Sequence, residues 1–376
     1  MQRLVHLLGG LEIGGKERVA LELARRARRL GLAHELLLFD RDYRDPIEHL
    51  DPGDVPCTLL RRGKGLDLRF TAALAGWLER ERVEVVHAHN DSALVYGVLA
   101  AKRAQQRPRV VGTFHTRPSH STLAGRLACR WASKRADVVT AVSPDLRRDL
   151  VNWGWLARCR VVWNGVDVDE YRPDGPTDGW RGRLGVAPGA LLVGHVGRFH
   201  RVKRQRDLLE AARALRDRAP PLHVAFVGLG PELAAFEAEV QSERGISVVP
   251  RVHDMAAFYR EIDLFVLCSI EEAAPLVLLE AMACARASVT TDAGSMVEML
   301  AANGPAPCGR IVPQRQPEAL ARAIGELASD ERARRELGLR ARERAVSEYS
   351  EEREWQDYVR LYRGEAEGSR ALAAAE

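Results

Sequence analysis

The sequence predicts an α/β protein of two doubly wound domains, each built on a parallel sheet. Short apolar segments alternate with longer amphipathic, Arg- and Ala-rich segments from end to end, which is the pattern of strands and helices in such sheets. The alternation stops at Asn164 and Gly165, a turn dipeptide, and restarts after a stretch rich in Pro, Gly and Asp. The length of 376 residues also fits two globular domains.

In the first half, each strand candidate is a short apolar run and each helix candidate is a longer amphipathic one. The strand candidates are residues 4–8, 35–39, 57–60, 83–88, 110–114, 138–142 and 161–163. The helix candidates are residues 17–30, 67–82, 92–103, 123–135 and 144–153. Together they make one complete Rossmann-like domain.

The second half repeats the alternation. Its strand candidates are residues 191–196, 223–227, 247–249, 264–267 and 287–290. Its helix candidates are residues 204–218, 231–244, 256–261, 276–284, 317–327 and 331–346, followed by an aromatic-bearing segment at 355–362. Ser295 and Glu298 match a capping box, which predicts a further helix start.

These patterns divide the chain into four parts. We expect a first domain at residues 1–165, a linker at 166–185, a second domain at 186–345 and a C-terminal segment at 346–376. Ligands of such sheets bind at the carboxyl ends of the strands, so the loops that follow the strands are the places to search for a site.

Composition excludes several classes of protein. With 46% hydrophobic and 29% charged residues, the chain is neither disordered nor membrane-spanning, and no window reaches the roughly 18 apolar residues of a spanning helix. Glu12 and Lys16 come too early for a signal peptide, and the six cysteines show no metal-ligand spacing. We therefore expect a cytoplasmic protein that meets a membrane only from its surface, at the inner face of the cytoplasmic membrane.

Charge is unevenly distributed along the chain. Residues 1–165 carry 28 basic and 18 acidic side chains, a net charge of +10, whereas residues 166–376 carry 28 and 34, a net charge of −6. Between Lys102 and Arg135 there are nine basic residues and no acidic one. This indicates an anionic partner for the first half, such as phospholipid headgroups, a lipid diphosphate or a nucleic acid. The alternative is an Arg-rich composition that decorates solvated helices.

The densest chemical signal follows the strand candidate at 264–267. Pro275 stands where a helix begins, a position that suits its fixed φ and missing amide hydrogen. The amides of Leu276 and Val277 would then point, with the positive end of the helix dipole, at a bound anion. Glu272 precedes this helix and Glu280 lies inside it. Because a carboxylate near a phosphate needs neutral partners, sugar or ribose hydroxyls are the natural ligands of both.

A second signal lies at the end of the strand candidate at 191–196. Gly197 allows a tight turn, and Arg198 and Lys203 can both face a diphosphate, Arg as a bidentate fork and Lys as a point charge. Only five of the 56 basic residues are Lys, so a Lys at this position is informative.

In this order and spacing, the motifs resemble those of the family-4 retaining glycosyltransferases of the GT-B fold. The motifs are Glu272-x7-Glu280 followed by Ala-Met-Ala, Gly197-Arg198-x4-Lys203, Asn164-Gly165-Val166-Asp167, Thr291-Asp292-Ala293-Gly294, Gly14-Gly15-x-Glu17-Arg18-Val19, His87-Ala88-His89 and Val227-Gly228-Leu229-Gly230-Pro231. The resemblance implies two Rossmann-like domains that face a central cleft, with a C-terminal helix that returns to the first domain.

For the second domain, the resemblance implies a site for a nucleotide-sugar donor. Arg198 and Lys203 would bind the diphosphate, with the Leu276 and Val277 amides nearby. Glu280 would hold the ribose and Glu272 the transferred sugar. The backbone near Arg251 and Val252 would hold the base.

For the first domain, the resemblance implies that Gly14 and Gly15 approach the diphosphate and that His115 reaches the sugar or the acceptor hydroxyl. The catalytic set would then be His115, Arg198, Lys203 and Glu272. Members of the family retain the anomeric configuration by a front-face mechanism that needs no protein nucleophile. We expect no direct catalytic role for His87 and His89, which share one strand.

Two Asp-x-Asp triplets, residues 40–42 and 167–169, are the only sign of a metal-bound nucleotide. The second triplet follows the Asn-Gly turn and leads into the linker, which is a poor place for a metal site. We therefore expect no metal and no cofactor.

The chain departs from the family pattern at two places. Ala273 and Ala274 stand where a Gly and an aromatic residue are usual, and Ala285-Arg286-Ala287 replaces a usual Gly-x-Pro turn. Because Ala tolerates a positive φ poorly, these changes affect the expected orientation of the donor sugar.

We thus predict a retaining, metal-independent glycosyltransferase. It would move a hexose-type sugar from a nucleoside diphosphate to a hydroxyl of a glycan or lipid-linked acceptor. The process would be the synthesis of envelope polysaccharide, lipopolysaccharide or glycolipid. Residues 102–135 are the candidate contact with an anionic membrane, and no nucleic-acid partner is expected. Two alternatives stay open. One is another enzyme on the same frame, a nucleotide-sugar epimerase or a sugar phosphorylase, and the other is a non-catalytic donor-binding subunit.

Overall fold

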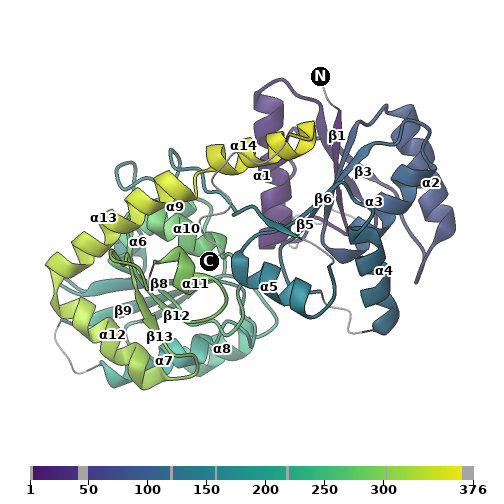
Figure 1. Cartoon of the computed structure of the whole chain (residues 1–376). Coiled ribbons are helices and arrows are strands. Elements are labelled where there is room, and N and C mark those ends of the chain that lie inside the picture. The colour runs from purple at the N-terminus through teal and green to yellow at the C-terminus, as the bar shows by residue number, and fades with distance from the viewer. Residues whose placement is uncertain are drawn as a thin grey trace. The chain divides into compact units, whose positions relative to one another are not determined.

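The computed structural model describes residues 3–40, 50–118, 122–156, 159–216, 220–301 and 303–365. The chain forms two compact units, coloured along the chain in Figure 1. Unit 1 comprises Met1–Asn164 and Glu354–Glu376, and unit 2 comprises Gly165–Arg353. Arg41 and Asp42 of the first Asp-x-Asp triplet, residues 119–121 of the basic stretch and the tail from 366 onward lie outside the described residues.

Unit 1 is built on a seven-stranded parallel sheet with the order β3-β2-β1-β4-β5-β6-β7. The strands are β1 (Leu4–Leu8), β2 (His34–Leu38), β3 (Cys57–Leu59), β4 (Val85–His89), β5 (Arg109–Phe114), β6 (Val138–Ala141) and β7 (Arg160–Val161). The central strands β1 and β4 are buried along their whole length, because helices cover both faces of a parallel sheet.

Three helices in the described part of unit 1 begin at residues whose side chains accept hydrogen bonds from their first amides. The helices of this unit are α1 (Gly15–Arg29), α2 (Leu68–Arg80), α3 (Asp91–Arg103), α4 (Leu123–Ser133), α5 (Pro144–Asn152) and, from Glu354 onward, α14 (Glu351–Arg363). Asp67, Thr122 and Ser143 cap α2, α4 and α5 through their side-chain oxygens. Tyr358 and Tyr362 of α14 are buried and hydrogen bond to Thr113 and His87 of the unit 1 sheet.

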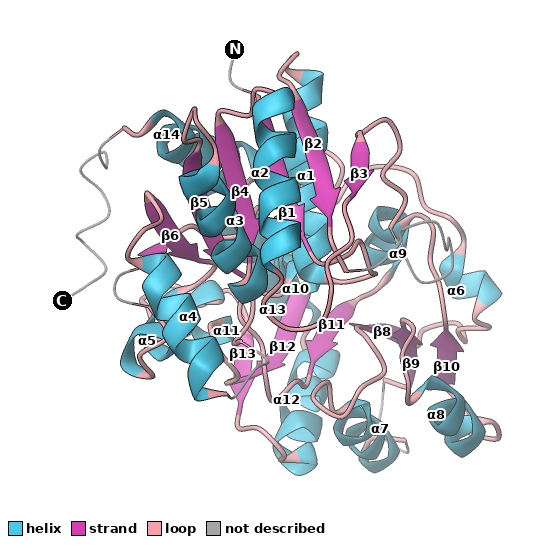
Figure 2. Cartoon of the chain, turned by 90° about the vertical axis from the view of Figure 1, so that its right-hand side faces the viewer, coloured by secondary structure: helices cyan, strands magenta, loops and turns pink. Residues whose placement is uncertain are grey.

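Unit 2 is built on a six-stranded parallel sheet with the order β10-β9-β8-β11-β12-β13. The strands, drawn as magenta arrows in Figure 2, are β8 (Leu191–Val196), β9 (Leu222–Val227), β10 (Ile246–Val249), β11 (Leu264–Leu267), β12 (Ala287–Thr291) and β13 (Arg310–Val312). The sequence did not indicate β13, because its three residues form too short an apolar run.

The helices of unit 2 follow its strands. They are α6 (Trp180–Arg183), α7 (Gln205–Ala214), α8 (Leu233–Val240), α9 (Met255–Glu261), α10 (Leu276–Ala283), α11 (Met296–Met299), α12 (Pro317–Ser329) and α13 (Glu331–Glu348). Residues 166–185, which the sequence suggests as a linker, belong to unit 2. Trp180 is buried there against Phe258, and Arg181 bonds to Asp263, so this segment is packed rather than free.

Both sheets have the strand order of doubly wound folds, so the predicted fold class is confirmed. In each sheet the chain winds outward in one direction and then in the other. The reversal falls between β1 and β4 in unit 1 and between β8 and β11 in unit 2. Loops on the carboxyl side of this reversal point are the usual place for a ligand. Within the described ranges, no helix is long and apolar enough to cross a bilayer.

One departure from the family pattern, Ala285, adopts a backbone conformation that favours glycine. Ala285 follows the end of α10 with a φ of 56°. Its amide bonds to the Met282 carbonyl and the Arg286 amide bonds to the Ala281 carbonyl, which is the Schellman pattern that normally has Gly at the left-handed position. Ala273 and Ala274 are not among the residues with positive φ, so the loop between β11 and α10, residues 268–275, does not need Gly there. We call this segment the acidic loop.

We therefore expect Ala285→Gly to stabilise unit 2 by about 1 kcal/mol, since it removes the strain of a left-handed Ala. Urea denaturation of both proteins measures the difference. The exposed helical Ala235 provides the control, because Ala235→Gly should destabilise by about 1 kcal/mol. A lower midpoint for Ala285→Gly would contradict the prediction.

Candidate active site

The reversal point of the unit 2 sheet brings together two of the residues that the sequence assigned to the donor, Lys203 and Glu272. Arg198 lies exposed in the loop after β8, and Lys203 follows in the same loop, half-buried. Glu272 lies in the loop after the neighbouring strand β11. The two loops are also joined through their backbones, because the Ile270 amide donates to the Val202 carbonyl at 2.8 Å.

Lys203 and Glu272 form an ion pair. The Lys203 Nζ lies 2.5 Å from the Glu272 Oε1, and the Ser269 hydroxyl donates to the same oxygen at 2.7 Å. Their side chains are 20% and 8% exposed, so the pair is partly shielded from water. The sequence placed both residues in one site but did not predict this contact. The pairing keeps a buried carboxylate compensated beside a place suited to phosphate.

Helix α10 begins next to this pair. Pro275 is its N-cap residue and offers no side-chain cap, so the amides of Leu276 and Val277 in the first turn have no partner within the helix. Glu280, one turn further on, is 2% exposed. The positive end of the helix dipole therefore lies beside Lys203 and Glu272.

The glycine loop after β9 holds the loop that carries Arg198. The Gly197 amide donates to the Val227 carbonyl at 2.9 Å, and the Phe199 amide donates to the Leu229 carbonyl at 2.8 Å. A Cβ on Gly228, whose φ is 143°, would lie 2.2 Å from the Gly197 carbonyl oxygen. This glycine is required because two backbones approach closely.

The loop after β12 contacts the acidic loop through hydrogen bonds and close backbone packing. The hydroxyl of Thr291 donates to the Ser269 carbonyl, and that of Ser295 donates to the Ala273 carbonyl. A helix does begin at Met296, but the predicted capping by Ser295 is wrong, since its hydroxyl serves the acidic loop instead. A Cβ on Gly294, whose φ is 56°, would lie 1.9 Å from the Glu272 carbonyl oxygen. Sequence reasoning missed these supports, although the Thr-Asp-Ala-Gly motif was their signal.

Arg251 and Val252 lie in the loop after β10, the edge strand of the unit 2 sheet. Three strand spacings of about 4.8 Å separate β10 from β11, or roughly 14 Å. Arg251 and Val252 thus follow a strand on the β10 side of the same sheet edge, two strands from β8 and three from β11.

In unit 1, the expected glycine loop precedes α1. Gly14 is the N-cap residue of α1, and Gly15, its first residue, is exposed. Among the described residues, apart from its chain neighbours and the α1 backbone, no atom lies within 4 Å of the position that a Cβ on Gly15 would take. Glu17, in the first turn, is 7% exposed and pairs with Lys16, whose Nζ lies 2.9 Å from its Oε1.

His115 lies directly after β5 and is 5% exposed. Its Nε2 lies 2.9 Å from the Nδ1 of His89, and its backbone amide donates to the Asn90 Oδ1 at 2.9 Å. Burial, and then the charge of Lys16, lowers the pKa of His115 to about 3. His115 is therefore a neutral ring near pH 7.

Asn90, which holds His115, is a supporting residue that the sequence did not reveal. It follows β4 with φ 69° and ψ −171°, a conformation occupied almost only by Gly. Its amide group bridges the Thr116 hydroxyl and the His115 backbone. Strained backbone of this kind concentrates at functional sites, which supports a site at the carboxyl ends of β4 and β5.

Comparison with known proteins places the chain in a family. Residues 13–170 match the model of Glycosyltransferase Family 4, and residues 177–344 match that of Glycosyl transferases group 1. EpsF of Bacillus subtilis is 27% identical over 316 residues, covering 77% of this chain and 79% of that protein. The D-inositol 3-phosphate glycosyltransferase of Geodermatophilus obscurus is 32% identical over 311 residues, covering 78% and 64%.

A solved structure of HepE from Anabaena in complex with UDP-glucose superposes with a TM-score of 0.80 at 22% identity, covering 95% of this chain and 98% of that one. The fold and the two family models define a glycosyltransferase of the GT-B fold, as the sequence predicted. The chain belongs to the group 1 glycosyl transferases, with a first half of the Family 4 type.

Proposed function

We propose that this glycosyltransferase moves a sugar, with retention and without a metal ion, from a nucleoside-diphosphate sugar to a hydroxyl of a glycan or lipid-linked acceptor. One observation carries the proposal. Lys203 and Glu272 pair at the reversal point of the unit 2 sheet, Glu272 lies in the loop that leads into α10, and Arg198 lies in the same loop as Lys203, so a diphosphate bound there would meet cations and a helix terminus.

In the proposed reaction, these unit 2 residues would act by electrostatic stabilisation of the leaving group. As the bond between the sugar and the phosphate breaks, negative charge grows on the departing diphosphate. Lys203 supplies a point charge and Arg198 a bidentate fork, and the amides of Leu276 and Val277 supply hydrogen bonds. Donors that are held in place before the reaction would need little reorganisation as this charge develops.

The two glutamates of the acidic loop and α10 suit hydroxyl groups. Glu272 uses its Oε1 for Lys203 and Ser269, and we assign its other oxygen to hydroxyls of the transferred sugar. We assign the buried Glu280 to the ribose. A carboxylate can accept several hydrogen bonds at once, so neither assignment requires breaking the Lys203 contact.

The remaining assignments concern the nucleotide base and the residues of unit 1. Arg251 and Val252, further along the same sheet edge, would hold the base by their backbone. In unit 1, Gly14 and Gly15 would offer amides to the diphosphate, and His115 would reach a hydroxyl of the sugar or the acceptor. The complex of HepE with UDP-glucose supports a nucleotide-sugar donor.

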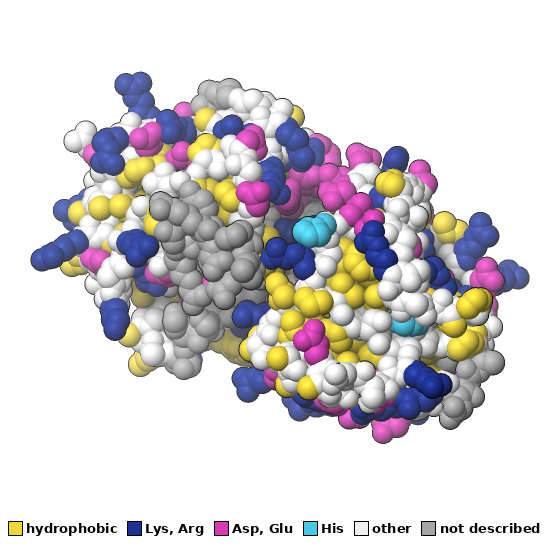
Figure 3. All heavy atoms as spheres, turned by 180° about the vertical axis from the view of Figure 1, so that it is seen from behind, with side chains coloured by type: hydrophobic (Ala, Val, Ile, Leu, Met, Phe, Trp, Pro, Cys, Tyr) yellow, Lys and Arg dark blue, Asp and Glu magenta, His cyan; other side chains and the backbone are white. Residues whose placement is uncertain are grey.

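The acceptor is assigned to unit 1, with a membrane surface as its source. Helix α4 exposes Leu123 and Leu127, which are 66% and 56% accessible, within the stretch from Lys102 to Arg135 that contains no acidic residue. Apolar side chains among basic ones suit an anionic bilayer surface. The face drawn in Figure 3 carries Lys and Arg side chains interspersed with acidic and apolar ones. We assign membrane contact to the surface of α4, through which a cytoplasmic protein would reach lipid-linked acceptors from the inner face of the membrane.

The proposal predicts stabilisation by a nucleotide. In a thermal-shift screen of nucleoside diphosphates and their sugars, we expect at least one to raise the melting temperature, because it binds only the folded protein. At 100 times its Kd such a ligand adds about 2.7 kcal/mol. The shift should be the same with EDTA and with Mg²⁺. If no nucleotide raises the melting temperature, the assignment of the donor site is wrong.

A further inference from the structure

Unit 1 buries a row of histidines that the proposed function leaves unexplained. His34 belongs to β2, His6 to β1, His89 to β4, and His115 follows β5. All four are at most 5% exposed. Because β2, β1, β4 and β5 are consecutive neighbours in the sheet, the row crosses it without a gap.

Strand register places the four rings on one face. His34 is paired with Leu4, and His6 lies two residues beyond Leu4. His6 is paired with His87, and His89 lies two residues beyond it. His89 is paired with Thr113, two residues before His115. Each step thus advances by two residues toward the carboxyl edge, and side chains two residues apart share a face.

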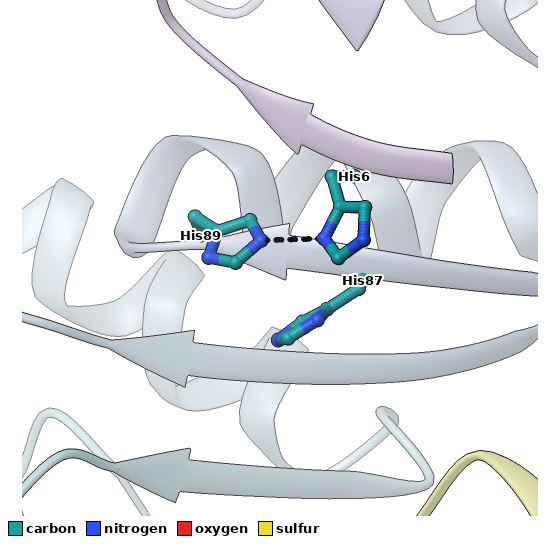
Figure 4. Close-up of side chains that lie close together, drawn as sticks. All are labelled: His6, His87 and His89. Carbon is teal, nitrogen blue, oxygen red and sulfur yellow. Dashed lines mark hydrogen bonds between the residues drawn. The ribbon is translucent and has the colours of Figure 1, made fainter. Parts of the chain in front are cut away.

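The rings contact one another through alternating nitrogens. His34 Nδ1 lies 3.2 Å from His6 Nε2, His6 Nδ1 lies 3.1 Å from His89 Nε2, and His89 Nδ1 lies 2.9 Å from His115 Nε2. Figure 4 shows the contact between His6 and His89 as a dashed line. Every contact joins an Nδ1 to an Nε2, so three hydrogen bonds link four rings.

Burial keeps these rings neutral. It lowers the pKa of His34 to about 4 and that of His115 to about 3, and it lowers the pKa of His6 and His89 well below the ordinary value. A neutral imidazole has one N–H and one bare nitrogen. If one ring donates through its Nε2, its neighbour must accept at Nδ1 and donate through its own Nε2. All four rings therefore have the same tautomer.

The free end of the row decides which tautomer it is. The Nδ1 of His115 is buried and has no hydrogen-bond partner among the described residues. In the Nδ1–H tautomer this atom would be an orphaned buried donor, which proteins avoid more strongly than an unused acceptor. The Nε2–H tautomer leaves a lone pair there, and it is also the form that a free imidazole side chain prefers.

We propose that His34, His6, His89 and His115 form a histidine relay in which every ring is the neutral Nε2–H tautomer, so that His115 presents its Nδ1 lone pair to a hydroxyl hydrogen of the ligand. His34, His6 and His89 are positioning residues. The relay adds a positioning role for three histidines to the proposed function, and it rests on that function only for the chemical nature of the ligand. It selects a hydroxyl over a phosphate oxygen, since two acceptors do not bond.

A metal centre is the competing arrangement of the same rings. His6, His87 and His89 offer nitrogens within 4.8 Å of one another. However, the Nδ1 of His87 lies 2.8 Å from the Tyr362 hydroxyl, and its Nε2 lies 2.7 Å from the Thr113 hydroxyl. An ion bound by the three rings would displace hydrogen bonds made by each of them, whereas the relay uses the contacts as they stand.

Ring nitrogens can be observed directly. In the full chain labelled with ¹⁵N-histidine, two-bond ¹H–¹⁵N correlation spectra at pH 7 separate protonated from bare nitrogens, and single His→Phe variants assign the signals. We expect His34, His6, His89 and His115 each to show a protonated Nε2 and a bare Nδ1. Protonated Nδ1 atoms, mixed tautomers along the row, or cationic rings would overturn the relay.

Two variants test the coupling between the rings. His6→Phe removes a link in the row, and we expect His34, which is then cut off from His115, to change from one tautomer to a mixture while His89 and His115 keep theirs. His87→Phe is the matched control, because His87 is equally buried beside His6 but hydrogen bonds to Tyr362 and Thr113 rather than to the row, and it should leave His34 unchanged. Equal effects of both variants would contradict the coupling. If His6→Phe does not fold, His89→Phe cuts the row one ring nearer to His115 and should release both His6 and His34.

Zinc titration of the labelled protein separates the relay from a metal centre. We expect no stoichiometric change at the relay rings, and simultaneous binding at His6, His87 and His89 would refute the proposal. None of these spectra requires a nucleotide. Failure of the thermal-shift screen would therefore reject the donor site while leaving the relay standing, and the converse also holds.

Discussion

Replacing Lys203 by Ala should lower kcat by about 100- to 1,000-fold, the usual cost of removing one preorganised group that stabilises developing charge. We expect this large effect because Lys203 is half-buried and its Nζ lies 2.5 Å from Glu272, in the loop that leads into α10. Turnover is measured as release of nucleoside diphosphate from the donor that stabilises the protein most. Wild-type turnover in the variant would reject the site.

Stability must be separated from catalysis in this experiment, since Lys203→Ala leaves the Glu272 carboxylate without its cation. Adding Glu272→Gln to Lys203→Ala removes that charge. We expect the double variant to regain melting temperature but not turnover. Arg201→Ala, which removes an exposed cation in the same loop, is the control and should keep both.

The same assay decides between the alternative functions. Sugar transfer gives free nucleoside diphosphate and a lengthened acceptor from a labelled donor. An epimerase or a phosphorylase would give a different labelled product. A non-catalytic subunit would bind the donor and release nothing, and Lys203→Ala would then change binding alone.

Gly294→Ala should destabilise unit 2 by about 2 to 4 kcal/mol, combining a left-handed backbone with a backbone clash. The added Cβ would lie 1.9 Å from the Glu272 carbonyl oxygen, so one of the two loops must move. In the protein that remains folded, we expect kcat to fall about 100-fold, because displacement of a positioning loop by about 1 Å has effects of that size. Urea denaturation and steady-state kinetics measure the two effects.

Gly189 offers a matched control for Gly294. Its φ is 78°, but within the part of the chain that the structure describes no non-neighbouring atom lies within 4 Å of the position that a Cβ would take. Gly189→Ala therefore tests the backbone conformation alone, and we expect a loss of about 1 kcal/mol with full turnover. If Gly294→Ala costs no more than Gly189→Ala, the acidic loop is not held in the way the structure indicates.

Local patterns predicted most of the strands and helices because burial on both faces makes parallel strands continuous apolar runs. Strand β13 and helix α6 escaped prediction, since three or four residues carry too little periodicity. At Ser295 the pattern correctly predicted that a helix begins, but it wrongly predicted that the Ser295 hydroxyl caps that helix. The hydroxyl donates to the Ala273 carbonyl instead. Such a choice of hydrogen-bond partner is decided by tertiary contacts.

The candidate site could likewise be predicted only in part from the sequence. The two charged loops could be named from sequence because each follows an apolar strand and carries unusual residues, Lys203 among scarce lysines and Glu272 before Pro275. The ion pair between them could not, since it depends on β8 and β11 becoming neighbours although residues 197–263 separate them along the chain.

By itself, the sequence determined that this chain is two doubly wound domains with a basic first half, an acidic second half and the motifs of a glycosyltransferase. Only the tertiary structure decided what those residues touch. Histidines 26 to 83 residues apart became hydrogen-bonded neighbours, because strand order and register, which no local pattern encodes, place their rings on one face.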